Sequence, residues 1–491
     1  GMSVEIYAET PGSLFDINYP DLETMLGAHR FAWVPLAGSD VNPDWVDAIW
    51  RCWVKKFGTN QTGWPWHAYS AGERAINIID FAAQHSLPGD RQKTIKVLAD
   101  HADIIRNNLE YFGEEYTSNH LSNNGRSLLR IGLALGLEEY VNDGAKILIT
   151  EANRIFGCSG LLNEGSSHYH LLITRNYIDA WIAARNAGLE QTAELGDIAE
   201  RAIAAISVLC LPGGMPLIGD ISPDAPPRYF SFLSGAGAND TKSLSVTNSK
   251  LHKASTDLLS QITPPPLNLA AADGWHHFEV GAWRALAYVS PDGWPPMPGH
   301  GHDDLGSFEL HDGETPVLID PGRGSYINGE YTKAEVHNSV IIDGNSPSPI
   351  NRPYYNKTFR RRIIKQPPEF TRTHKSYILR SYGFSRMAGI GTFERKWHFN
   401  ARSINIVDRI DGIGTHRIER RYFTPADVET GEEGLTLTSN GRRWRIRSDT
   451  QPTLIRGTRW VAYGDGVPAT IIIFRQLRKL PCEETTILER V

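Results

Sequence analysis

A chain of 491 residues exceeds the size at which one hydrophobic core normally suffices, so the sequence predicts two domains. Its formal net charge of −6 argues against a nucleic-acid-binding protein, because phosphate recognition normally needs an excess of basic residues. The four cysteines form no C-x-x-C pair, which argues against a cysteine metal site and a disulfide scaffold.

The first half of the chain has the patterning of successive helices. Asn42-Pro43 marks the start of one helix, and Ser70 with Glu73 forms a capping box that predicts the start of another. Further amphipathic helices are expected at residues 94–109, 120–135, 140–155, 169–187 and 194–209. At least seven helices with short connections are typical of a bundle or of a closed array of helical hairpins.

The pattern changes at the proline run Thr263-Pro264-Pro265-Pro266, which predicts an extended linker because consecutive prolines cannot continue a helix. Beyond it, short β-rich runs alternate with turn pairs such as Asp312-Gly313. This pattern is typical of an antiparallel β-sandwich. We therefore predict a multidomain α + β protein, with an all-α domain at residues 1–262 and a β-sandwich at residues 263–491.

Two basic clusters stand out in the predicted β-domain. The first comprises Arg360, Arg361, Arg362 and Lys365, and the second comprises Arg442, Arg443, Arg445 and Arg447. We expect both to be charged faces of strands, and a local basic groove is the alternative.

The segment His300-Gly301-His302-Asp303-Asp304 is the strongest functional signal in the chain. His300 and His302 share one face if the segment is extended, since side chains alternate along a strand. Together His302, Asp320 and His337 supply two imidazoles and a carboxylate, a set suited to zinc with a fourth position open. The chain has 17 histidines, so an incidental pair is the alternative to a metal site.

Two polar islands, residues 118–124 and 163–170, lie at the starts of predicted helices. Asn and Ser are common N-caps, so capping alone explains the first island. It explains the second less well, because one cap does not need a Glu, two His and a Tyr together.

Taken together, these motifs resemble those of the heparinase II/III-like polysaccharide lyases. The matching positions are Asn119-His120, residues 164–170, residues 300–304, Asp320-Pro321-Gly322 and His337-Asn338. The resemblance spans roughly residues 30–350 and implies an N-terminal α/α toroid of helical hairpins followed by an antiparallel β-sandwich. His168 and Arg323 depart from the family pattern, so the substrate is not transferable from the family.

The resemblance implies cleavage of a uronic-acid polysaccharide by β-elimination, which leaves a 4,5-unsaturated uronate end. Asn119, helped by His120, would neutralise the substrate carboxylate so that charge can develop at the adjacent carbon. Tyr169 is the leading Brønsted residue, with His300 or His120 as its partner. Which residue is base and which is acid depends on whether the elimination is syn or anti, and the sequence leaves this open.

Four further residues are candidates for substrate binding. Glu164 and His170 belong to the second polar island, and Tyr326 and Tyr331 lie between two proposed metal ligands. For the two tyrosines, packing in the core or on the surface is the alternative.

The two histidines of the H-x-H pair receive different roles. A histidine that binds zinc has one nitrogen committed and cannot move protons freely. We therefore assign His302, Asp320 and His337 to a mainly structural Zn²⁺ and leave His300 for the substrate.

Two other functions stay open: a noncatalytic polysaccharide-binding or assembly protein, and a zinc-dependent glycan hydrolase. The expected partner is an acidic polysaccharide or oligosaccharide, with neither nucleic acid nor membrane, since no apolar run reaches the roughly 18 residues that span a bilayer. No signal peptide is visible, which predicts a cytoplasmic protein, or a periplasmic one if an export signal has been removed.

Overall fold

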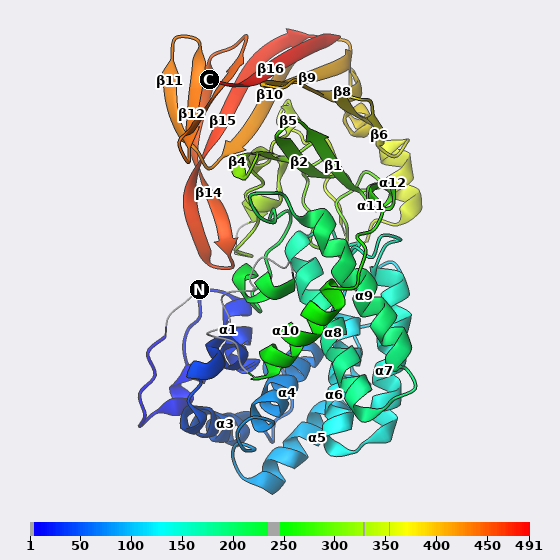
Figure 1. Ribbon diagram of the computed structural model, residues 1–491, viewed down its shortest axis with the longest axis vertical. Helices are drawn as coiled ribbons and strands as arrows, with labels where there is room; N and C mark the ends of the chain where they lie inside the picture. The colour runs from blue at the N-terminus through cyan, green and yellow to red at the C-terminus, as the bar shows by residue number, and fades with distance from the viewer. Residues whose placement is uncertain (1–3, 234–245, 328, 353) are drawn as a thin grey trace. The chain divides into compact units, whose positions relative to one another are not determined.

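The computed structural model describes residues 4–233, 246–327, 329–352 and 354–491, which form two compact units (Figure 1). The helical unit comprises Gly1–Leu162, His170–Ile206 and Ser222–Pro264, and the sheet unit comprises Asn163–Tyr169, Ser207–Ile221 and Pro265–Val491. The chain therefore enters the sheet unit twice before its second half, through two short inserted segments. One of them carries Glu164 and Tyr169, which the sequence places in the helical domain.

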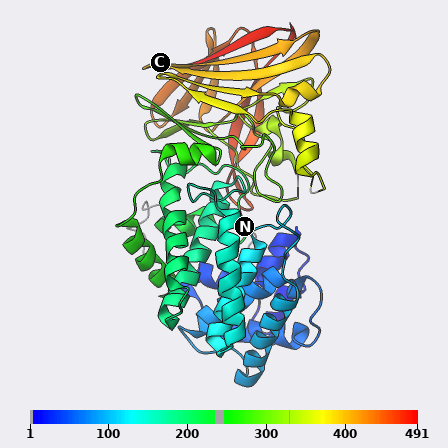
Figure 2. The same cartoon turned by 90° about the vertical axis from the view of Figure 1, so that its right-hand side faces the viewer.

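The described helices of the helical unit lie side by side, as Figure 2 shows. They are η1 (Pro11–Phe15), α1 (Leu22–His29), α2 (Trp33–Ala37), η2 (Gly38–Asp40), α3 (Pro43–Phe57), η3 (Trp64–Trp66), α4 (Ala68–Ala82), α5 (Arg91–Asn107), α6 (His120–Leu135), α7 (Glu138–Ile155), α8 (Ser167–Ala187), α9 (Thr192–Leu209), η4 (Pro227–Leu233) and α10 (Val246–Leu259). The first residues of α8 and the last of α9 belong to the sheet unit. Buried aromatic rings, among them the stacked pair Trp50 and Trp53, fill the core between the early helices.

The two predicted helix starts have different outcomes. The Asn42 side chain accepts hydrogen bonds from the backbone at the start of α3, as predicted. The predicted capping box is wrong, because α4 begins at Ala68 and both of its residues lie inside the helix. Ser70 accepts a hydrogen bond from Arg30, and Glu73 accepts one from Arg126, so both side chains serve tertiary contacts instead.

The sheet unit contains three antiparallel sheets and several short helices. Its elements are α11 (Leu267–Ala272), β1 (Trp275–Val280), β2 (Trp283–Tyr288), β3 (Glu309–Asp312), β4 (Thr315–Leu318), η6 (Gly329–Thr332), η7 (Ala334–Val336), β5 (Val340–Ile342), α12 (Lys357–Ile364), β6 (Glu369–Arg372), β7 (Ser376–Ser381), η8 (Gly383–Arg386), β8 (Ile390–Phe399), β9 (Ser403–Gly412), β10 (Thr415–Thr424), β11 (Asp427–Gly431), β12 (Gly434–Ser439), β13 (Arg442–Ser448), β14 (Pro452–Ala462), β15 (Asp465–Lys479) and β16 (Cys482–Arg490). The strand orders are β1-β2-β3-β4, β14-β15-β10-β5 and β11-β12-β13-β16-β9-β8-β7-β6.

One hydrophobic cluster joins the three sheets, because it takes Trp283 from the first, Tyr422 from the second and Trp397 from the third. Alternating burial along β8 and β9 gives the eight-stranded sheet one buried face and one more exposed face. The predicted order, helices first and antiparallel sheets second, is confirmed.

The two basic clusters also have different outcomes. The second cluster lies on β13, where Arg443, Arg445 and Arg447 form a charged strand face as predicted, whereas Arg442 lies on the opposite face and pairs with Asp312. The first cluster lies on and just after α12, so the prediction of a strand face is wrong there. Among the described residues, no helix combines the length and the apolar character that crossing a bilayer requires.

Candidate active site and metal centre

The metal-site motifs lie in loops between the strands of the sheet unit. His300 and His302 precede β3, Asp320 follows β4, and His337 lies between η7 and β5. Residues 300–302 form no regular strand, so the condition for a shared strand face is not met. The two histidines nevertheless face one common carboxylate, which belongs to Asp220.

The side chain of Asn338 holds these loops together. Its amide nitrogen donates to the carbonyl of Phe308 at 2.6 Å and to that of Ile319 at 3.0 Å. Its amide oxygen accepts from the backbone of Phe423 at 2.6 Å. Asn338 thus fixes the chain next to Asp320 and His337, which gives the H-N motif a structural role.

A buried ion pair supports the same loops from the eight-stranded sheet. Arg395 and Asp408 are fully buried and form two hydrogen bonds of 2.6 and 2.9 Å. The other end of the Arg395 guanidinium donates to the carbonyls of Gly306 and Asn338. Removing one partner of such a pair costs about 3–5 kcal/mol, because it leaves an uncompensated buried charge.

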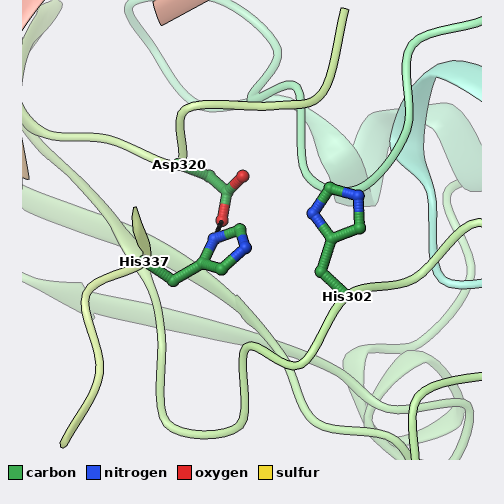
Figure 3. Close-up of side chains that lie close together, drawn as sticks. All are labelled: His302, Asp320 and His337. Carbon is green, nitrogen blue, oxygen red and sulfur yellow. Dashed lines mark hydrogen bonds and ion pairs between the residues drawn. The ribbon is translucent and has the colours of Figure 1, made fainter. Parts of the chain in front are cut away.

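His302, Asp320 and His337 are buried, and each offers one ligand atom within 4.8 Å of the others. Figure 3 shows one ring nitrogen of His302 turned toward the other two side chains. His302 Nε2 lies 3.0 Å from Asp220, whereas Nδ1 is buried and has no hydrogen-bond partner among the described residues. A buried imidazole nitrogen without a partner is costly unless it binds an ion, so these residues fit a metal centre.

The electrostatics around the three ligands favour a cation. Burial opposes protonation of His337, but the Asp320 carboxylate outweighs burial and raises the pKa of His337 to about 9. Burial raises the pKa of Asp304 to about 8 and that of Asp303 to about 6, because carboxylates crowded away from water resist ionisation. A metal ion bound beside these carboxylates would favour their ionised forms.

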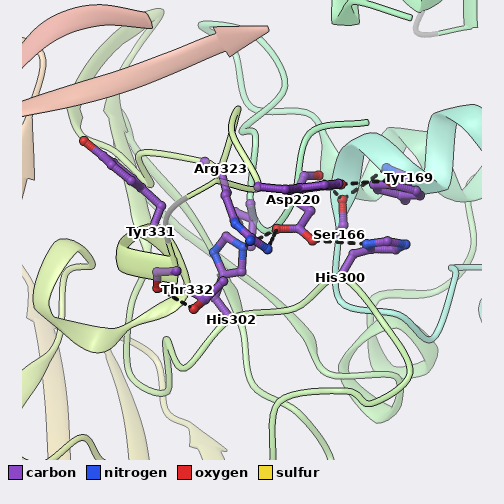
Figure 4. A network of polar contacts seen from close by, with 12 residues as sticks. Ser166, Tyr169, Asp220, His300, His302, Arg323, Tyr331 and Thr332 are labelled. Atoms are coloured by element: carbon purple, nitrogen blue, oxygen red, sulfur yellow. Dashed lines mark hydrogen bonds and ion pairs between the residues drawn. The ribbon is translucent and has the colours of Figure 1, made fainter. Parts of the chain in front are cut away.

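Next to the metal centre, Tyr169, Tyr326 and His300 form an aromatic cluster (Figure 4). The rings of Tyr169 and His300 stack with their centroids 3.4 Å apart and their planes at 11°. The hydroxyls of Tyr169 and Tyr326 lie 2.9 Å apart. The structure therefore brings together three of the predicted site residues that are far apart in the sequence.

Asp220 connects this cluster to the metal centre, and sequence reasoning missed it. One carboxylate oxygen lies 3.1 Å from His300 Nδ1, and the other lies 3.0 Å from His302 Nε2 and 3.2 Å from Arg323 Nη1. Burial opposes ionisation of Asp220, but hydrogen bonds from the two histidines hold its pKa well below the usual range. Asp220 is therefore a carboxylate that fixes both imidazole rings.

The backbone before Asp220 explains its position. Gly219 has φ = +81°, and an added Cβ would approach the carbonyl oxygens of Gly165 and His300 to 2.6 Å. The Asp220 amide donates to the His300 carbonyl at 2.9 Å, and the His300 amide donates to the Glu164 carbonyl at 2.7 Å. Only glycine allows these segments to approach so closely.

The remaining candidates of the sheet unit take different positions. Glu164 Oε2 lies 3.6 Å from His300 Nε2, so Glu164 borders the aromatic cluster. The Arg323 guanidinium lies 4.6 Å from the ring centre of Tyr326. Tyr331 is separate from the cluster, since its hydroxyl accepts from the backbone of Thr458 at 3.0 Å and Figure 4 shows its side chain pointing away.

In the helical unit, Asn119 and His120 lie at the start of α6. Asn119 is buried, and its carbonyl accepts from the first turn of the helix. His120 Nδ1 lies 2.7 Å from Glu110, and its ring packs on Tyr69 with the centroids 4.5 Å apart. Burial opposes ionisation of Glu110, but His120 and His67 outweigh it and lower the Glu110 pKa.

His170, a predicted substrate-binding residue, is fully enclosed in the helical unit. Its Nδ1 accepts from the backbone of Leu162 at 3.2 Å, and its Nε2 lies 3.0 Å from the carbonyl of Ala202. Burial lowers the pKa of His170 to about 4. Both ring nitrogens bond to the backbone, so the structure gives His170 a structural role.

Comparison with known proteins finds a family model that matches the second part of the chain. Residues 262–484 match the family model described as "Heparinase II/III-like, C-terminal". The resemblance predicted from the motifs is confirmed. No curated protein sequence matches the chain.

Two solved structures extend the likeness to the helical unit. A heparan sulfate lyase HepC mutant from Pedobacter heparinus is 17% identical, with a TM-score of 0.61 over 96% of this chain and 78% of that one. A heparinase III is 15% identical, with a TM-score of 0.68 over 95% of this chain and 76% of that one. At these identities the likeness shows the fold, and it confirms the predicted heparinase-like class of helical toroid plus β-sandwich.

Proposed function

We propose that the protein is a polysaccharide lyase that cleaves a uronic-acid polysaccharide by β-elimination and leaves a 4,5-unsaturated uronate. The observation that carries this proposal is the stacked pair of Tyr169 and His300, two proton-transfer groups held together beside a fixed carboxylate. The lyases among the structural neighbours support the same class of enzyme.

Elimination needs a group that removes the C5 proton and a group that protonates the leaving oxygen. The Asp220 carboxylate accepts a hydrogen bond from Nδ1–H of His300, which favours the tautomer with its lone pair on Nε2. His300 can therefore accept a proton at Nε2, or donate one from there once it is protonated. Asp220 keeps the ring in one orientation during both steps.

Tyr326 prepares Tyr169 for the same task. Burial raises the pKa of Tyr326 well above its usual value, so Tyr326 keeps its proton when Tyr169 ionises. Across the 2.9 Å contact its hydroxyl then donates to the Tyr169 oxygen and stabilises the phenolate. This contact therefore favours Tyr169 over Tyr326 as the proton-transfer group.

The helical unit would supply the neutralisation of the substrate carboxylate. Asn119 and His120 lie at the N-terminus of α6, where backbone N–H groups and the helix dipole favour an anion. We assign the uronate carboxylate to this end of the helix, with Asn119 as its principal hydrogen-bond donor.

We further propose that His302, Asp320 and His337 bind Zn²⁺, as the two imidazoles and one carboxylate indicate. When bound, zinc would supply positive charge that offsets the buried carboxylates, and it would tie the β2–β3 connection to the β4–β5 connection. Through Asp220 the same loops orient His300, so the metal would act on the reaction by positioning.

The test is a panel of polyuronates and sulfated uronic-acid polysaccharides incubated with the zinc-loaded protein. A lyase produces the ultraviolet absorbance of the conjugated uronate on at least one substrate. New reducing ends without this absorbance would indicate the hydrolase. Binding without any cleavage would indicate the noncatalytic protein, and either result would overturn the proposal.

A further inference from the structure

The helix α12 and the residues just after it carry an unusual concentration of positive charge. Residues 344–368 contain six Lys and Arg and no Asp or Glu, in a chain whose net charge is −6. Arg361, Arg362 and Lys365 are exposed and form no ion pair within the described part of the chain. Such a local excess of cations attracts anions to this part of the sheet unit.

The cations surround a hollow rather than a flat surface. Its volume is about 190 Å³, enough for an acidic group and part of a sugar ring. Its lining residues include Trp294, Lys357, Arg360, Arg361, Ile364 and Lys365. Arg362, on the same helix, is not among them.

The residues at the base of the hollow are closely packed. Ile364 is buried, and a Cβ added to Gly293 would lie only 3.2 Å from it, so the two segments pack closely. Trp294 is buried as well, and both its Nε1 and Arg360 Nε lack hydrogen-bond partners among the described residues. The unpaired N–H groups of these two lining residues keep the electrostatic potential in the hollow positive.

Among the described residues that line the hollow, Asp292 is the one carboxylate, and it offsets little of the charge of Arg360. Asp292 lies 3.8 Å from Arg360 Nη1, and its side chain is 58% exposed. Ion pairs of this length at the surface interact weakly. An incoming anion therefore meets Arg361 and Lys365, which form no ion pair among the described residues.

Aromatic rings extend the site beside the helix. Tyr355 packs on Phe359 with centroids 4.4 Å apart and on Tyr354 with centroids 4.9 Å apart. The side chains of Tyr354 and Phe359 remain exposed. Exposed rings next to cations suit a sugar that carries acidic groups, because the rings cover its apolar face while the cations bind its charge.

We propose that the α12 hollow is a binding site for the acidic groups, carboxylate or sulfate, of a polysaccharide chain. The choice of a polysaccharide over other polyanions rests on the proposed function. Arg361 and Arg362 both lie in the last turn of α12, where cations stabilise a helix. That role would affect both residues alike, whereas the binding site needs Arg361 and not Arg362.

The experiment measures binding without turnover, so every variant also carries Tyr169→Phe. Each protein is titrated calorimetrically with a polyuronate, with dextran sulfate and with neutral dextran. We expect at least one polyanion to bind and neutral dextran not to bind. Arg361→Gln should lower the affinity for the polyanion about 10-fold, and Arg361→Lys should restore it. Arg362→Gln should change the affinity by about twofold or less.

The polyuronate and dextran sulfate arms show which acidic group the site prefers. The proposal is overturned if neither polyanion binds, if Arg361→Gln binds like the parent, or if Arg362→Gln loses as much. Tighter, Arg361-dependent binding of a short single-stranded DNA would assign the site to nucleic acid and also overturn it. Equal thermal unfolding temperatures of Arg361→Gln and Arg362→Gln exclude misfolding as the cause of a difference. Because the experiment measures binding, its outcome does not depend on whether the protein is a lyase.

Discussion

The metal centre and the aromatic cluster are built in contrasting ways. The three metal ligands come from 36 consecutive residues, 302–337, and all are buried in loops that Asn338 holds. The aromatic cluster combines an inserted segment at Tyr169 with residues more than a hundred positions later. On the proposed function, the first site would bind an ion in a fixed geometry, whereas the second would admit a substrate.

Asp220 contacts residues of both sites, with one carboxylate oxygen near His300 and the other near His302. The metal centre and the aromatic cluster therefore differ in role but are not independent of each other. A change at the aromatic cluster should affect the reaction alone, and a change at Asp220 should affect both sites.

The largest expected effect is that of Tyr169→Phe. Loss of the phenol should lower kcat by about 10³-fold, within the range that proton-transfer residues contribute. The initial rate of unsaturated uronate formation measures it. Tyr331→Phe is the matched control, because its hydroxyl bonds to the β14 backbone, and its rate should stay close to that of the parent.

His170 should affect stability and not substrate binding. Its folded pKa of about 4 lies below the ordinary 6.5, so its contribution is complete above pH 6.5 and is lost as the pH falls toward 4. The loss amounts to about 3 kcal/mol of unfolding free energy. Urea unfolding of the parent and of His170→Gln between pH 7 and pH 4, the window set by that pKa, measures it.

The His170→Gln protein should have a lower free energy of unfolding than the parent at neutral pH. This free energy should then fall less steeply than that of the parent as the pH decreases. The structural role would be contradicted if the unfolding free energy of the variant depended on pH as that of the parent does. A raised KM in a stably folded variant would indicate that His170 binds substrate.

Asp220→Asn should weaken both sites at once. We expect zinc affinity to fall by about 10–100-fold, as for other groups that orient a metal-binding histidine, and kcat to fall with it. Competition with a chromogenic chelator measures the affinity. If kcat falls while zinc affinity is unchanged, Asp220 serves His300 alone and the two sites are not coupled.

Tyr326→Phe should have the smallest effect on the reaction. Without its donor the Tyr169 phenolate loses a hydrogen bond, so its pKa rises and kcat/KM falls by about tenfold. The pH profile of kcat/KM should move to higher pH. A profile identical to that of the parent would mean that Tyr326 does not act on Tyr169.

The sequence predicted those features that depend on local pattern or on a complete motif. The helix His120–Leu135 has the predicted ends, since its amphipathic run stops at Gly136, which adopts φ = +70°. The three proposed metal ligands lie together because they belong to the β2–β3 and β4–β5 connections of the sheet unit, whose loops meet.

Other features depend on long-range contacts that leave no local pattern. Asp220 reaches the site because the segment Ser207–Ile221 crosses into the sheet unit, and nothing in its own sequence indicates that crossing. The glycine and aspartate that follow apolar residues in Leu217-Ile218-Gly219-Asp220 could have marked Asp220 as a candidate, but they do not predict which residues it contacts. The capping box failed for a related reason, because Ser70 and Glu73 bond to distant arginines.

The most direct test of the proposed lyase is the mass of its products from a defined uronate oligosaccharide. Elimination divides the substrate without adding water, so the product masses should sum to that of the substrate, and Tyr169→Phe should yield almost none. Products whose masses sum to substrate plus one water would contradict the account, because only hydrolysis adds that water.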